Sequence, residues 1–329
     1  VTITTPTTSA TYATTTSTLN LSGTALDSTS GLNTITYTLN SAAPVNASGT
    51  SAWSIANLSL QAGVNIISVT AKDNADNSAS ATLTVTYTIP TPGTIALSAS
   101  TYSTAENSPT VIISAARTGG SYGVTSVQYT TSNGTATAAS ETAGSDYTVA
   151  SGTLSWADKD SANKTFTIAI TNDSTDEADE TVNIALSTAT GATLGTPSSA
   201  VLTITDDDLA PTVAWTSSSQ SIPENGGSAT ITAQLSSASA KAISIPWTVS
   251  GTATGGGTDY SITTSPLNIP AGSTSAAISV TITNDSTYET PDETVIVTMG
   301  TPTNATQGTT TVHTLTITND DTIPDTIAP

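Results

Sequence analysis

One acidic sequence occurs twice along this chain, at a nearly constant separation. The first copy, ITNDSTDEADETVNIAL, contains Asp173 and Glu180, and the second, ITNDSTYETPDETVIVTM, contains Asp285 and Glu293. Asp173 and Asp285 lie 112 residues apart, and Glu180 and Glu293 lie 113 residues apart. A near-constant offset across a whole segment indicates two copies of one domain of about 110 residues, which is an ordinary domain size.

Other acidic residues repeat with the same spacing. Asp146 in GSDY corresponds to Asp259 in GTDY, and the run Asp206–Asp208 corresponds to Asp320–Asp321. Carboxylates repel one another, so they gather at several separate chain positions mainly when a cation holds them. Hard oxygen ligands without nitrogen or sulfur favour Ca2+. The pattern therefore predicts calcium sites, one set in each copy.

Short segments with alternating apolar residues fill most of the chain. Residues 35–39, 166–170 and 278–282 are examples, and such segments are rich in Thr, Val and Ile and bounded by Gly, Asn, Asp or Pro. This pattern is typical of half-buried antiparallel strands, and no convincing helical period is present. Repeated short strands with turn signals predict an all-β chain of three tandem antiparallel β-sandwiches.

Proline-containing joints divide the chain. The joint Ile89–Gly93 contains two prolines, which favour a stiff, extended spacer. The second joint, Asp206–Pro211, also carries candidate metal ligands. The expected units are residues 1–89, 94–208 and 211–321, followed by a linker or tail at 322–329.

Residues 94–208 and 211–321 both resemble Calx-beta domains, which are calcium-binding sandwiches. The resemblance rests on Glu-Asn pairs, a Gly-Thr-Ala segment, a Gly-x-Asp-Tyr segment, the Asn-Asp…Asp-Glu-Thr loop and terminal aspartates. The first three are at Glu106-Asn107 and Glu224-Asn225, at Gly134 and Gly251, and at Asp146-Tyr147 and Asp259-Tyr260. Residues 1–89 resemble a bacterial Ig-like domain through LNLSGTA, beginning at Leu19, and AGVNIISVTAKDNADN, beginning at Ala62.

The Calx-beta resemblance implies that the calcium ligands lie at one end of each sandwich. In the first copy they would be Glu106, Asp146, Asp173, Glu177, Glu180, Asp206, Asp207 and Asp208. In the second copy they would be Glu224, Asp259, Asp285, Glu289, Glu293, Asp320 and Asp321. Asp176 and Asp179 stay outside this set, because strand-like alternation turns them away from their neighbours.

Composition argues against several classes of function. The chain has 25 acidic and 5 basic residues, a net charge of −20, which disfavours nucleic acids and anionic membranes. It has no cysteine and one histidine, so a catalytic triad or a Cys-His pair is nearly excluded. We expect His313 to face solvent or lie on an edge strand. The segment Asp73–Asn77 is expected to form a hairpin turn, and the four tryptophans are expected to pack in cores or joints.

The residues together predict a non-catalytic structural role. We expect a segment or subunit of a bacterial extracellular surface assembly, an adhesin stalk or filament whose sandwich ends and joints are stiffened by Ca2+. Its partners would be other copies of itself or neighbouring repeats of a longer chain, without nucleic acid or membrane insertion. Two alternatives stay open: a module that binds a glycan or a cell-surface protein, and accessory domains of a secreted enzyme.

Overall fold

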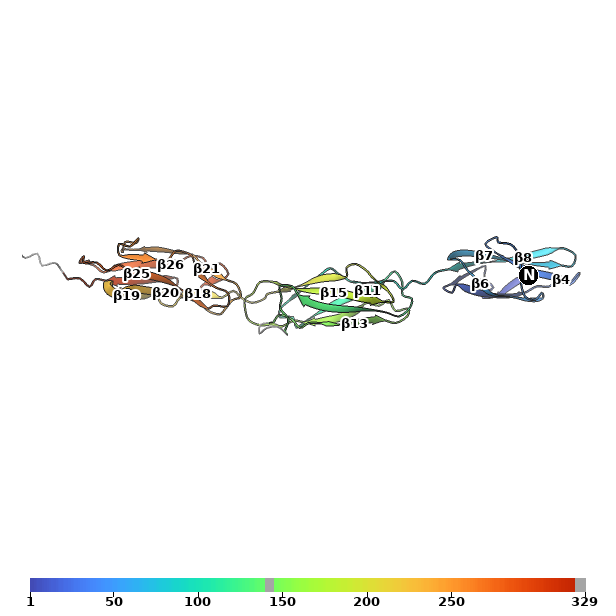
Figure 1. Cartoon of the computed structure of the whole chain (residues 1–329), viewed down its shortest axis with the longest axis horizontal. Helices are drawn as coiled ribbons and strands as arrows, with labels where there is room; N and C mark the ends of the chain where they lie inside the picture. The colour runs from blue at the N-terminus through green and yellow to red at the C-terminus, as the bar shows by residue number, and fades with distance from the viewer. Residues whose placement is uncertain (140–144, 323–329) are drawn as a thin grey trace, which may run out of the picture.

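The computed structural model describes residues 1–139 and 145–322, and it is built almost entirely of β-strands. Figure 1 shows three β-sandwiches that follow one another along the long axis. The one helical turn in the described ranges is η1 (Glu224–Gly226), so the predicted all-β fold of tandem sandwiches is confirmed. No helix in this part of the chain is long and apolar enough to cross a membrane. The expected tail, 322–329, lies outside the described residues except for Thr322.

The N-terminal sandwich contains two sheets, ordered β1-β3-β6 and β2-β8-β7-β4-β5. Its strands are β1 (Thr2–Thr5), β2 (Thr11–Thr14), β3 (Thr18–Thr24), β4 (Leu32–Leu39), β5 (Val45–Asn46), β6 (Ala52–Ser59), β7 (Gly63–Asp73) and β8 (Ser78–Tyr87). The expected hairpin turn at Asp73–Asn77 joins β7 to β8. The Asp73 carboxylate stabilises it by accepting hydrogen bonds from the backbone N–H groups of Ala75 and Asn77 at 2.8 and 2.9 Å.

The middle sandwich contains sheets ordered β10-β17-β15-β12-β13 and β14-β11-β9-β16. Its strands are β9 (Thr94–Leu97), β10 (Thr101–Ala105), β11 (Thr110–Thr118), β12 (Thr125–Asn133), β13 (Ser151–Trp156), β14 (Lys164–Ala169), β15 (Glu180–Thr190), β16 (Thr193–Leu194) and β17 (Ser199–Thr205). Strand β10 runs parallel to β17, while β15 runs antiparallel to β17.

The C-terminal sandwich repeats this arrangement, with sheets β19-β28-β26-β22 and β23-β25-β20-β18-β27 and a small pair, β21-β24. Its strands are β18 (Thr212–Trp215), β19 (Ser219–Pro223), β20 (Ser228–Leu235), β21 (Ile243–Ile245), β22 (Trp247–Gly251), β23 (Tyr260–Ile262), β24 (Leu267–Ile269), β25 (Ser275–Ile282), β26 (Glu293–Met299), β27 (Thr306–Gln307) and β28 (Val312–Thr318). Parallel pairing of β19 with β28 matches that of β10 with β17.

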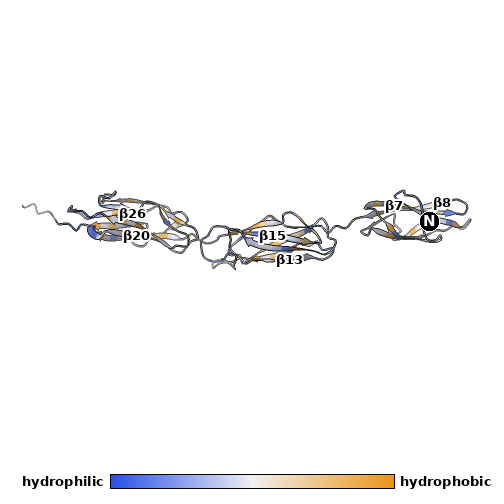
Figure 2. Cartoon of the chain, viewed as in Figure 1, coloured by the Kyte–Doolittle hydropathy of each residue, from blue (hydrophilic) through white to orange (hydrophobic). Residues whose placement is uncertain are grey.

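Each sandwich has a separate hydrophobic core formed by the inward residues of its alternating strands. Figure 2 shows hydrophobic residues distributed along the strands of all three sandwiches. All four tryptophans are buried, as expected: Trp53, Trp156, Trp215 and Trp247.

The expected position of His313 is wrong. It lies on β28, an interior strand between β19 and β26, and only 2% of the residue is exposed. Period-two alternation places it on the same face as buried Leu315 and Ile317, and its Nδ1 atom lies 2.7 Å from the carbonyl oxygen of Ser217. The His313 side chain therefore points into the core because its position in the alternating strand faces inward.

Candidate metal sites at the sandwich ends

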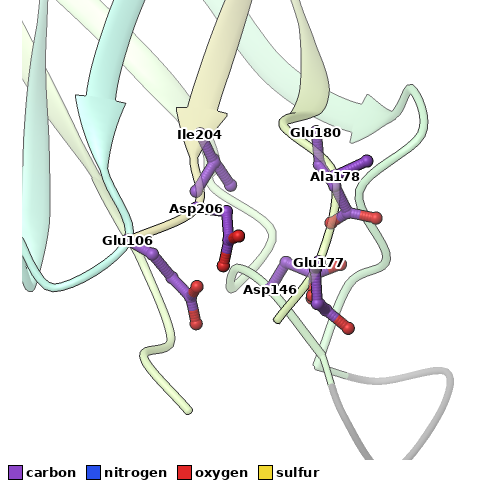
Figure 3. A pocket seen from close by; sticks show the side chains of 7 residues that line it. All are labelled: Glu106, Asp146, Glu177, Ala178, Glu180, Ile204 and Asp206. Atoms are coloured by element: carbon purple, nitrogen blue, oxygen red, sulfur yellow. The ribbon is translucent and has the colours of Figure 1, made fainter. Parts of the chain in front are cut away.

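Three strand ends bring the acidic residues of the middle sandwich together. Because β10 and β17 are parallel, Ala105 pairs with Thr205, and the residues that follow them, Glu106 and Asp206, leave the sheet at the same end. Strand β15 runs the opposite way and begins there with Glu180. Figure 3 shows these side chains, with those of Asp146 and Glu177, gathered around one pocket.

Two groups of carboxylates form at this end. The outer group contains Glu106, Asp173 and Asp208, and the inner group contains Asp146, Glu177 and Glu180. Within each group, one carboxylate oxygen of each residue lies within 4.8 Å of the others. Such spacing suits oxygens that converge on a shared cation.

The C-terminal sandwich repeats both groups at the homologous end. Its outer group contains Glu224, Asp285 and Asp321, and its inner group contains Asp259, Glu289 and Glu293. Pro291 adds one residue to this loop, yet Glu289 still joins the inner group.

The same backbone contacts hold the outer glutamate in both sandwiches. The N–H of Asp173 donates to Glu106 Oε1 at 2.8 Å, and the N–H of Asp285 donates to Glu224 Oε1 at 3.0 Å. Both glutamates are buried, with 7% and 4% exposure. A single oxygen of each carboxylate thus orders the loop that carries the next candidate ligand.

Three sequence-predicted ligands lie outside these groups. Asp207 accepts hydrogen bonds from the backbone and side chain of Asn107, and Asp320 accepts one from the side chain of Asn225. Both therefore close the Glu-Asn turn. Asp206 lines the pocket of Figure 3 and also forms an ion pair with Lys241 of the next sandwich.

Crowding changes the proton affinity of the grouped carboxylates. Burial, together with a hydrogen bond to Asp146, raises the pKa of Glu180 to about 8, and burial raises the pKa of Glu177 to about 7. In the C-terminal sandwich, burial and Asp259 raise the pKa of Glu293 to about 7. The charged form of each glutamate is therefore disfavoured without a counter-charge.

Unpartnered carboxylate oxygens also point to a cation. In the C-terminal sandwich, Glu224 Oε2, Glu293 Oε2 and Asp321 Oδ2 are buried and have no hydrogen-bond partner among the described residues. Burying a carboxylate oxygen without a partner is costly, and a hard cation removes that cost by accepting its lone pair. The donor set, oxygen alone, fits Ca2+ better than a transition metal.

A contact between sandwiches covers the acidic end of the middle one. Asp176 is 4% exposed, and its carboxylate accepts hydrogen bonds from Ser239 Oγ at 2.7 Å and from Lys241 Nζ at 2.7 Å. Lys241 Nζ also lies 3.4 Å from Asp206 Oδ2. Burial lowers the pKa of Lys241, but its bonds to the two aspartates outweigh burial and raise it above its ordinary value.

Sequence reasoning missed this joint contact. Lys241 is the only lysine or arginine between residues 165 and 329, and that isolation is the signal that the sequence offers. At the homologous place in the C-terminal sandwich, Tyr288 replaces Asp176 and Asn319 replaces Asp206. The two acidic ends are therefore alike in their carboxylate groups but differ where the middle sandwich contacts its neighbour.

Comparison with protein families gives a match over the two acidic sandwiches. A family model described as Calx-beta domain matches residues 90–208 and again residues 207–321. Sodium/calcium exchanger 1 of Bos taurus is 30% identical over 209 residues, covering 57% of this chain and 21% of the exchanger. The chain thus spans about a fifth of the length of that relative.

Solved structures also resemble this chain. The structure of CBD12 from CALX1.2 is 23% identical and covers 68% of this chain and 99% of its own, with a TM-score of 0.33. Mouse cadherin-23 EC22-24 is 15% identical and covers 98% of this chain and 99% of its own, with a TM-score of 0.34. TM-scores below 0.5 do not establish a shared overall arrangement, so the family match carries the assignment.

Proposed function

Because the chain belongs to the Calx-beta domain family over residues 90–321, we propose that it is a non-catalytic structural segment whose acidic sandwich ends bind Ca2+. In this proposal the segment is part of a bacterial extracellular surface assembly, an adhesin stalk or filament. Residues 1–89 form an Ig-like module, and residues 94–208 and 211–321 form two Calx-beta modules. The partners are other copies of the chain or neighbouring repeats.

The observation that carries this proposal is the repetition of an outer and an inner carboxylate group at the same end of two sandwiches. Each outer group supplies a buried glutamate and two aspartates, and each inner group supplies one aspartate and two glutamates. Four groups correspond to four ions per chain. Without a cation their mutual repulsion destabilises the loops that carry them.

The contact at the second joint supports a mechanical role for the metal. Asp206 lines the pocket of the middle sandwich and also pairs with Lys241 of the next sandwich. A cation bound in this pocket would therefore lie beside Asp206, the residue that contacts Lys241 across the joint. When Ca2+ orders the carboxylates, the joint contact is held in one geometry, and the angle between the two sandwiches varies less.

Calorimetric unfolding and small-angle scattering of the whole chain test the proposal. At free Ca2+ tenfold above its dissociation constant, each site adds about 1.4 kcal/mol, so two sites add about 2.8 kcal/mol to each acidic sandwich. We expect both sandwiches to unfold at higher temperature in millimolar Ca2+ than in EGTA, and the particle to become longer and stiffer.

Titration calorimetry supplies the stoichiometry, which we expect to be four. If the unfolding curves and scattering profiles in EGTA are identical to those in Ca2+, calcium binding is refuted. A rise in unfolding temperature without any change in scattering would refute the stiffening role alone. Electron microscopy of concentrated protein in Ca2+ tests filament formation, and isolated monomers would contradict it.

A further inference from the structure

The joint between the N-terminal and middle sandwiches is built around a buried arginine. Arg117 lies on β11, is 3% exposed, and sits at the opposite end of the middle sandwich from the acidic groups. Its guanidinium donates five hydrogen bonds, all to backbone carbonyl oxygens. The acceptors, at 2.8–3.3 Å, belong to Pro92, Tyr122, Gly123, Ala157 and Asp160.

These five carbonyls come from three separate segments. One is the interdomain joint, one is the loop between β11 and β12, and one is the loop between β13 and β14. A guanidinium has five N–H donors in a fixed planar fork, so this arrangement satisfies its full hydrogen-bonding capacity. Loss of the side chain would remove all five of these hydrogen bonds at once and leave the three segments without their common donor.

Further contacts attach the joint to the middle sandwich. Thr91 Oγ1 donates to the carbonyl of Gly119 at 2.7 Å, and the N–H of Tyr122 donates to the carbonyl of Thr91 at 3.0 Å. Gly120 fits closely here, because a Cβ at this position would lie 2.2 Å from Thr91 Oγ1. Residues 91–93 therefore belong to the middle sandwich.

The span left between the two sandwiches is very short. The N–H of Thr88 donates to the carbonyl of Thr14, so Thr88 is still held by the N-terminal sandwich. Only Ile89 and Pro90 lie between Thr88 and Thr91, and the ring of Pro90 fixes its φ angle. The part of the joint that neither sandwich holds by these bonds is therefore two residues long.

The C-terminal sandwich provides an internal comparison. Arg117 pairs with Ile95 in the middle sandwich, and Leu235 pairs with Val213 at the same register in the C-terminal one. The second joint has no such arginine. It is held instead by Lys241 against the carboxylates of Asp176 and Asp206.

We infer that Arg117 is a metal-independent staple of the first joint, so that the N-terminal sandwich keeps a fixed orientation whether or not Ca2+ is present. The chain then has two joints of different kinds. The first is rigid at all times, and the second responds to the metal. The statement about the second joint rests on the proposed function, whereas the statement about Arg117 does not.

Spin-label distances in the whole chain test this inference. The protein has no cysteine, so introduced pairs can be labelled without background. Ser78→Cys with Thr153→Cys spans the first joint, and Thr153→Cys with Ser261→Cys spans the second; all three positions are exposed. We expect the first distribution to be narrow and identical in EGTA and Ca2+, and the second to narrow only in Ca2+.

Arg117→Leu copies the residue at the homologous position. We expect it to broaden the first distribution in both conditions and leave the second unchanged. The N–H of Tyr122 should also exchange with solvent about tenfold faster, as expected from losing roughly one net hydrogen bond. Leu235→Met is the matched control and should alter neither distribution.

Gly120→Ala serves as a second variant if Arg117→Leu does not fold. Its Cβ would displace Thr91 and detach the joint while Arg117 is retained, so the first distribution should broaden. A first-joint distribution that changes with Ca2+ in the wild type, or that stays narrow in the folded variants, would overturn the inference. A second joint that ignores Ca2+ would count against the proposed function alone.

Discussion

Glu224→Gln should have opposite effects on stability with and without Ca2+. Glu224 is 4% exposed and shares its group with Asp285 and Asp321 within 4.8 Å. Two unit charges at 4.8 Å repel by about 0.9 kcal/mol in water and by about 3.5 kcal/mol at an effective permittivity of about 20. Because Asp285 is exposed, we expect a net gain near the lower limit, about 1–2 kcal/mol in EGTA.

The amide keeps the structural contact of the carboxylate. Its oxygen can still accept the hydrogen bond from the N–H of Asp285, so the loop stays ordered. In Ca2+ the variant lacks one ligand of the outer site and should lose about 1.4 kcal/mol of the metal-dependent gain. The unfolding temperature of the C-terminal sandwich should therefore rise in EGTA and respond half as strongly to Ca2+.

Differential scanning calorimetry of the whole chain measures both effects. A change of 1 kcal/mol moves the unfolding temperature of a domain of about 100 residues by about 4–8 °C. Asp292→Asn is the matched control, because it removes one negative charge from the same end without removing a grouped carboxylate. If Glu224→Gln lowers stability in EGTA and leaves the calcium response intact, Glu224 only orders the loop and does not bind Ca2+.

Three further outcomes are expected. Because Glu177 and Glu180 have raised pKa values of about 7 and about 8, the metal-free fold loses stability as pH rises from about 4.5 to 8. Calorimetry in EGTA should show this fall, with affinity for Ca2+ rising over the same window; a metal-free unfolding temperature that rises with pH would contradict it. Lys241→Met leaves the buried carboxylate of Asp176 without its ammonium partner, so chemical denaturation in EGTA should show a loss of about 1–2 kcal/mol, between the values for exposed and buried pairs. An unchanged denaturation midpoint would mean that the contact between Lys241 and Asp176 contributes nothing to stability. Gly251→Ala places a Cβ 2.1 Å from a backbone carbonyl oxygen at a φ of 127°, so the urea midpoint should fall by the equivalent of about 1–3 kcal/mol, whereas normal stability would show that this strand end relaxes.

The strands and the carboxylate groups could be predicted because both follow from local pattern. Alternating residues such as 166–170 can bury one face only as a strand. A repeat offset of 112–113 residues relates Asp146, Asp173 and Glu180 to their counterparts, and the offset from Glu106 to Glu224 is 118 residues. Even Glu289, two residues before the inserted Pro291, reaches its group, because a loop absorbs one residue more easily than a strand.

The joints could not be predicted in the same way. Arg117 is bound by backbone carbonyls, which every residue carries, so no side-chain motif encodes its surroundings. Strand-like alternation excludes Asp176 from the predicted ligands, but Asp176 lies outside any named strand and forms an ion pair with Lys241 of the next sandwich. Such contacts depend on how two domains meet, a property that periodicity within one domain does not contain.

The parallel pairing of the second strand with the last strand determines how the middle and C-terminal sandwiches resist a pulling force. Strand β10 pairs with β17 over five residues, and β19 pairs with β28 over five residues, both in parallel. Tension applied through the chain would pull the two strands of each pair in opposite directions along their length. All hydrogen bonds of the ladder then bear load together in shear, whereas a hairpin pulled at its open end separates one bond at a time.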